Sequence, residues 1–162
     1  MQLKWLLSHT RGYLELGMVE EAAAELERVP PSAAQHFDVR ALRALVLQEK
    51  KQWAALVPLA ASLAREKPDD PGWWIMWAYA VRRAESLDAA EKILLQATTN
   101  HPKEATIQFN LGCYACQRGD LVRARAYVDC AIALDKHFRE AATSDPDLAP
   151  LREHEAKNKS ST

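Results

Sequence analysis

The chain has 162 residues and a mass of 18.2 kDa, which is enough for one domain. Its 21 Lys and Arg residues are balanced by 22 Asp and Glu residues. The resulting formal charge of −1 argues against a nucleic-acid-binding domain, whose surface is normally strongly basic. Apolar residues make up 48% of the chain, and we find no strand-like alternation bounded by turns. We therefore expect an all-α protein.

The cysteines and the N-terminus indicate the cellular environment. Cys113, Cys116 and Cys130 are too few for a disulfide framework. The first apolar run is shorter than the core of a secretion signal, and Arg11 follows it at once. No stretch approaches the roughly 18 apolar residues of a membrane span. We expect a soluble, reduced, cytoplasmic protein.

A 34-residue period runs through most of the chain, because segments that start at residues 3, 37, 71 and 105 align without gaps. Residues 71–104 and 105–138 correspond best, and 3–36 and 37–70 are looser. Small residues recur at fixed places in the last two segments: Ala78, Ala90, Ala97, Gly112, Ala124 and Ala131. Side chains of this size let two helices approach closely where they cross.

These positions carry the signature of the tetratricopeptide (TPR) repeat, and the chain resembles that family over Leu3–Phe138. The resemblance implies a right-handed α-solenoid of four antiparallel helix pairs, one pair being Trp73–Ala84 and Leu87–Thr99. Residues 139–152 are similar to the segment that often closes TPR arrays. We expect residues 1–152 to form one domain with this C-terminal cap, and the polar residues 153–162 to be a disordered tail.

The resemblance further implies a non-enzymatic scaffold or adaptor that binds a peptide segment of another protein in a concave groove. In the family, ligand-facing residues lie about two, five, nine and twelve positions into each segment, on one face of the first helix. From that face we select Arg11, Leu45, Gln48, Ile75, Tyr79, Arg82, Phe109 and Cys113, with Asn110 bordering it. The same positions include Lys4, Leu7, Asp38, Gly72 and Cys116. Such a groove suits apolar anchors and a carboxylate.

Other uses of this face stay open. The groove residues could pack against the protein's own terminal segment or against a second copy, so the sequence also allows a homodimer. A self-associating module would use Trp73, if exposed, or the looser first segment. A secretion-type chaperone would shield an apolar segment of a client protein. The carboxylate clamp of chaperone-binding TPR domains is absent, since Arg11 is the one cation at the matching positions.

The sequence carries no constellation typical of an enzyme, and we expect neither a cofactor nor a metal. Cys113 and Cys116 share a helix face, but no second Cys or His pair completes a zinc site. They fall within a helix, whereas redox pairs belong at helix N-termini. Their expected role is to fill space. Glycine-rich phosphate loops, paired catalytic carboxylates and nucleophile motifs are not found.

Overall fold

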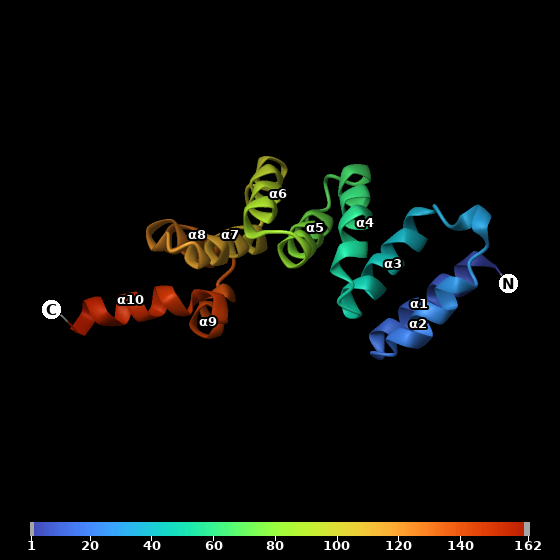
Figure 1. The fold of residues 1–162 in the computed structure, drawn as a ribbon, viewed down its shortest axis with the longest axis horizontal. Coiled ribbons are helices and arrows are strands. Elements are labelled where there is room, and N and C mark those ends of the chain that lie inside the picture. Colours follow the sequence, from blue (N-terminus) through green and yellow to red (C-terminus); the bar gives the residue numbers. More distant parts are fainter. Residues whose placement is uncertain (1, 161–162) are drawn as a thin grey trace. The chain divides into compact units, whose positions relative to one another are not determined.

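The computed structural model describes residues 2–160, which form helices and no strand, as expected for an all-α protein. The first helices of the four segments are α1 (Leu3–Glu15), α3 (Phe37–Glu49), α5 (Pro71–Ala84) and α7 (Ala105–Gln117). The second helices are α2 (Val19–Glu27), α4 (Trp53–Glu66), α6 (Leu87–Asn100) and α8 (Leu121–Leu134) (Figure 1). Both sets therefore begin at intervals of 34 residues. Within residues 2–160, no helix has the length and apolar character to cross a membrane.

Local sequence determines where these helices start and turn. Pro71 occupies the first turn of α5, where its missing N–H is not needed, and the Asp70 carboxylate accepts a hydrogen bond from the Gly72 N–H at 2.9 Å. The Asp120 carboxylate accepts from the Arg123 N–H at 3.1 Å in the same way at the start of α8. Gly119 precedes that helix with a φ of +82°, which a residue without a Cβ adopts readily.

Residues up to Ser86 form one compact unit, which contains α1 to α5 and the short 3₁₀ helix η1 (Pro31–Ala33). Leu6, Leu26 and Leu42 belong to the core between α1, α2 and α3. Leu56 and Ala80 belong to a second core, between α3, α4 and α5. Because large apolar side chains are removed from water in both places, these cores supply most of the stability of the unit.

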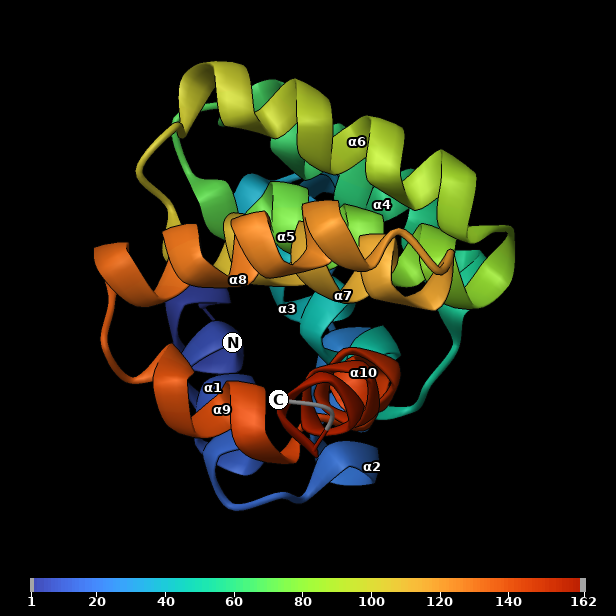
Figure 2. The ribbon, with the colours of Figure 1, turned by 90° about the vertical axis from the view of Figure 1, so that its left-hand side faces the viewer.

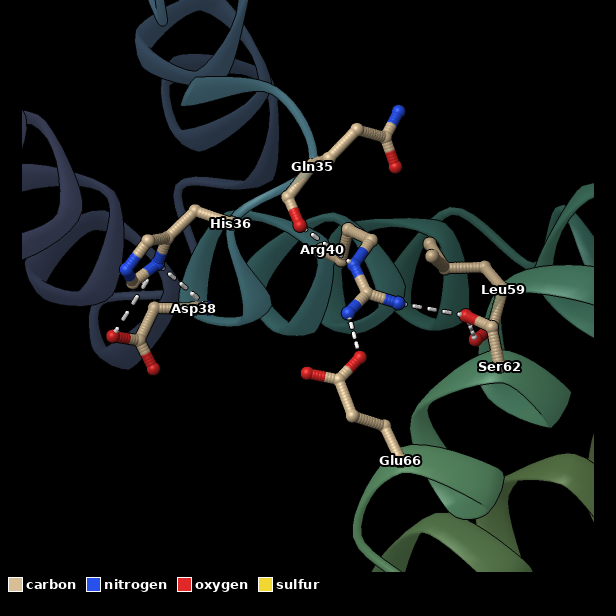
Figure 3. Close-up of polar contacts among 7 residues, drawn as sticks. All are labelled: Gln35, His36, Asp38, Arg40, Leu59, Ser62 and Glu66. Carbon is tan, nitrogen blue, oxygen red and sulfur yellow. Dashed lines mark hydrogen bonds and ion pairs between the residues drawn. The ribbon is translucent and has the colours of Figure 1, made fainter. Parts of the chain in front are cut away.

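A polar cluster around Arg40 ties α3 to α4 at the surface of this unit (Figure 3). The Arg40 guanidinium donates to the Gln35 carbonyl and to Ser62 Oγ, each at 3.1 Å, and pairs with the Glu66 carboxylate. Ser62 donates in turn to the Leu59 carbonyl at 2.7 Å. Because every named group has a partner within the cluster, it has a structural role.

Residues from Leu87 onward form the second compact unit, with α6, α7, α8, α9 (Phe138–Ser144), the 3₁₀ helix η2 (Pro146–Leu148) and α10 (Ala149–Ser160). α7 and α8 lie side by side in both ribbon views (Figures 1 and 2). A Cβ placed on Gly112 would lie 2.9 Å from Val128 Cγ2, so glycine is what permits this close approach. Arg118 joins α7 to α6 through Asp88 and, at 2.6 Å, Glu91.

The single domain expected over residues 1–152 stays a prediction. The chain divides into two compact units between Ser86 and Leu87, inside the third segment. A disordered tail was expected from residue 153, but α10 continues to Ser160, and residues 161 and 162 lie outside the described part. Glu155 pairs with Arg125 at 3.0 Å, and Asn158 bonds His154 at 3.1 Å one turn away, so polar contacts stabilise the helix.

Candidate functional site

A small apolar hollow lies on the exposed face of the first unit. It is lined by the side chains of α3, α4 and α5 and has a volume of about 310 Å³. Ile75, Met76 and Tyr79 come from α5, Gln48 from the end of α3, and Trp53 from the start of α4; the backbone of Gly72 completes it. The structure thus brings together the expected residues Gln48, Ile75 and Tyr79. A space of this size suits a single large apolar side chain.

The aromatic wall of this hollow is held rigidly. The Trp53 and Tyr79 rings meet edge to face with centroids 5.3 Å apart. Arg83 Nη2 donates to the Tyr79 hydroxyl at 2.9 Å, and its guanidinium lies 5.1 Å from the ring centroid. Tyr79 is nevertheless 36% exposed. An exposed but oriented aromatic ring is a good anchor, because little side-chain entropy remains to be lost on binding.

A second, polar hollow of about 530 Å³ lies between α1 and the start of α3. Its lining includes two cations, Lys4 and Arg11, and two acids, Glu15 and Asp38; Leu7, Ser8 and Gly12 complete it. Lys4 and Arg11 form no ion pair with any described residue. Arg11, Lys4, Leu7 and Asp38 were all expected on the ligand-facing side, and the structure brings them together here.

α3 connects the two hollows within the first unit. Asp38, at its start, lines the polar hollow and Gln48, near its end, lines the apolar one. Ten residues of helix span about 15 Å. Leu45 lies on the same helix between them and is 37% exposed. Arg82, on α5, is half-buried and lines neither hollow.

In the second unit, the expected groove residues of α7 are buried by the protein's own C-terminal segment. Phe109 packs on Phe138 of α9 with ring centroids 4.8 Å apart, and only 5% of its surface is exposed. Cys113 and Cys116 are buried as well, whereas Asn110 is half-buried. The expectation that Phe109 and Cys113 face a ligand is therefore not met. The alternative of self-packing describes this helix.

The contacts of the cap explain why it covers α7. Leu148 and Leu151 are almost completely buried, and Gln117 of α7 donates to the Asp147 carbonyl at 2.8 Å. Arg152 donates to the carbonyls of Ala142 and Asp145 at 3.1 and 2.8 Å, which fixes the turn between α9 and α10. Apolar burial and satisfied backbone groups thus hold the cap together.

The cysteines of α7 sit beside acidic groups of the cap. The Cys113 sulfur and one carboxylate oxygen each of Asp145 and Asp147 lie within 4.8 Å of one another. Asp145 also accepts a hydrogen bond from the Asp147 N–H at 2.9 Å, so its carboxylate caps η2. Burial raises the pKa of the Cys116 thiol; the Leu151 N–H opposes this rise, and the Asp147 carboxylate adds to it. Both thiols are thus buried within the packing of the cap.

Two residues that line the apolar hollow, Trp53 and Met76, lie outside the ligand-facing offsets. Arg83, which bonds the Tyr79 hydroxyl beside the hollow, was not selected from the sequence either. The signal that could have identified Trp53 as a site residue was its aromatic side chain at the first position of the second helix α4. Trp73, in contrast, is not an exposed contact residue: it is half-buried against Phe37, with ring centroids 5.9 Å apart.

Comparison with known proteins identifies the architecture. No family model and no curated protein matches the sequence. Among solved structures, MamA from Desulfovibrio magneticus RS-1 has a TM-score of 0.73 at 19% identity, over 82% of this chain and 75% of that one. TTC0263, a thermophilic TPR protein of Thermus thermophilus, has a TM-score of 0.69 at 19% identity, over 95% and 88%. The chain has the TPR fold.

YrrB, described as a TPR protein with an unusual peptide-binding site, is also similar, with a TM-score of 0.70 at 18% identity over 83% of this chain and 70% of that one. Identities this low establish the shared TPR fold and leave the ligand undetermined.

Proposed function

We propose that the first unit binds a peptide segment of another protein along α1, α3 and α5. The observation that carries the proposal is the apolar hollow formed by Gln48, Trp53, Ile75, Met76 and Tyr79, which α3 links to the polar hollow. Tyr79 is exposed yet held by Trp53 and Arg83. Oriented aromatic side chains of this type dominate the energy of many interfaces.

The two hollows indicate the chemistry of the peptide. A large apolar side chain fits the hollow beside Tyr79, and the Gln48 amide can bond the neighbouring backbone. Lys4 and Arg11, which have no acidic partner among the described residues, would attract a carboxylate. Since about 15 Å of α3 separates the hollows, an extended peptide needs about five residues between its apolar anchor and its acidic group. Its affinity should be about micromolar, because ordering the peptide offsets much of the contact energy.

The proposal can be tested with peptides selected from a library of random short sequences on the wild-type protein. We expect the selected peptides to share a large apolar residue and an acidic residue. Tyr79→Ala should raise their Kd by about tenfold or more, since it removes one wall of the hollow. Arg11→Glu should weaken acidic peptides and spare variants in which the acid is replaced by Gln.

Tyr127→Ala is the matched control for this experiment. Like Tyr79, Tyr127 is a partly exposed aromatic residue that interacts with an arginine one turn away, Arg123, but it belongs to α8 in the second unit. Its replacement should leave the Kd unchanged. Circular dichroism should first show that each variant keeps its helices. Equal loss of binding in Tyr79→Ala and Tyr127→Ala, or none in either, would contradict the proposed site.

A further inference from the structure

One side of α1 presents large apolar side chains to solvent. Trp5 is 59% exposed and Leu16, which ends the helix, is 75% exposed. Together with His9 and Gly12 they follow a spacing of four, three and four residues, which places them along one side of the helix; we call these four residues the α1 stripe. The helix at the end of a solenoid normally presents a polar face to solvent. The α1 stripe departs from this rule, so a partner surface is expected to cover it.

The α1 stripe contains a hollow as well as a protruding ring. Ser8, His9, Gly12, Tyr13 and Leu16 line a depression of about 290 Å³. A Cβ placed on Gly12 would meet no atom within 4 Å, so the floor of the depression is open. Trp5 stands on the same side one turn before it, with its ring centroid 6.2 Å from that of His9. A knob and a hole of matching apolar character thus occur on a single surface.

A surface that carries both a knob and its hole is self-complementary, which is what a two-fold symmetric interface requires. We propose that two copies of the chain associate through antiparallel α1 helices, with Trp5 of each copy inserted into the hollow of the other. The apolar hollow beside Tyr79 takes no part in this contact, whereas Lys4, Gly12 and Glu15 also line the polar hollow of the proposed peptide site.

The charges along α1 favour a second copy in this orientation. Lys4 lies near the start of the helix and Glu15 at its end, on the same flank of the α1 stripe. Neither pairs with a charged side chain among residues 2–160. Antiparallel packing brings Lys4 of each copy towards Glu15 of the other, twice by symmetry, whereas parallel packing would place like charges together.

Analytical ultracentrifugation of the purified chain tests the proposal. A pair of short helices makes a small interface, so we expect a reversible dimer with a Kd in the micromolar range, about 1–100 µM. Trp5→Ala should raise this Kd by about tenfold or more. Gly12→Leu should do the same by filling the hollow, although the open space at Gly12 lets the monomer accept it. Val122→Ala, at an 83% exposed apolar residue of α8, is the matched control and should have no effect.

A charge exchange tests the orientation separately. Lys4→Glu and Glu15→Lys should each weaken the dimer, and the double variant should restore it, because the exchanged charges again meet with opposite sign. A chain that stays monomeric up to about 100 µM overturns the proposal. A dimer that is insensitive to Trp5→Ala or to Gly12→Leu also overturns it, since the contact then lies elsewhere. A double variant that remains as weak as the single ones overturns the antiparallel pairing.

Discussion

Gly12 and Gly112 both lie within first helices, α1 and α7, but have opposite surroundings. At Gly112 a methyl group would press against Val128 Cγ2 at 2.9 Å and the Ala124 carbonyl at 3.3 Å, whereas at Gly12 it would meet nothing within 4 Å. Val128 has a branched, stiff side chain, and the carbonyl belongs to the backbone of α8. Neither group can move aside without disturbing the packing of α7 on α8.

We therefore expect alanine at the two positions to change the free energy of unfolding in opposite directions. Gly12→Ala should stabilise the protein by about 0.5–1 kcal/mol, because it removes the entropic cost of glycine in a helix. Gly112→Ala should destabilise it by about 1 kcal/mol, because overpacking exceeds that gain. Urea unfolding at a protein concentration below any self-association measures both. Equal changes in the free energy of unfolding for the two variants would mean that α7 and α8 pack less closely than in the structure.

At the scale of secondary-structure elements, the cap decides which helix face is available to a ligand. α9, η2 and α10 bury Phe109, Cys113 and Cys116 on α7, and Leu148 and Leu151 are their main anchors. The equivalent faces of α1, α3 and α5 remain exposed in the first unit. The same repeat position thus carries a solvent-exposed face in one unit and a packing surface in the other.

The rates at which the three cysteines react with a thiol reagent test whether the cap protects α7. In the folded protein Cys130, which is exposed, should react quickly with a thiol reagent, and Cys113 and Cys116 slowly. Since burial raises the pKa of Cys116, less of it is thiolate at a given pH than for a thiol of ordinary pKa, and its reaction should accelerate only as the pH is raised. Leu148→Ala should speed the two slow reactions by about tenfold or more, because it weakens the docking of the cap.

Leu134→Ala, at a 39% exposed residue of α8, is the control for the thiol experiment and should leave the three rates unchanged. Mass spectrometry after timed labelling assigns each rate to its cysteine. Three equal rates in the wild-type protein would show that the cap does not protect α7.

At the scale of the whole molecule, the chain consists of two compact units and divides between Ser86 and Leu87. Each has its own fully buried leucines: Leu56 and Leu63 in the first, and Leu94 and Leu111 in the second. In repeat proteins each element contacts mainly its neighbours, so stability is approximately a sum of local terms. A local defect should then have its largest effect in its own unit.

Hydrogen exchange measures this directly. Leu63→Ala should cost about 2–5 kcal/mol and accelerate amide exchange mainly in α3, α4 and α5. Leu111→Ala should cost a similar amount and accelerate exchange mainly in α6, α7 and α8. Uniform acceleration along the whole chain by either substitution would show one cooperative block in place of two.

The sequence by itself determined the helices and their order, because those depend on local chemistry. A 34-residue spacing of small residues, turn prolines and capping aspartates is visible without any long-range information. The resemblance to the TPR family also selected Gln48, Ile75, Tyr79 and Arg11, because the ligand-facing positions of that family fall on one face of the first helix. The TPR fold is confirmed on this basis by the solved structures.

Only the tertiary structure decided which of those faces is exposed. Phe109 and Cys113 are buried by a cap that lies more than twenty residues away in the sequence. Spacing within one repeat carries no information about that contact. Trp53 contacts Tyr79 from the neighbouring helix α4, and Arg83 contacts it from one turn further along α5. Spacing within one repeat does not reveal these contacts either. Periodicity fixes the direction in which a side chain leaves its helix, whereas exposure depends on what the rest of the chain packs against it.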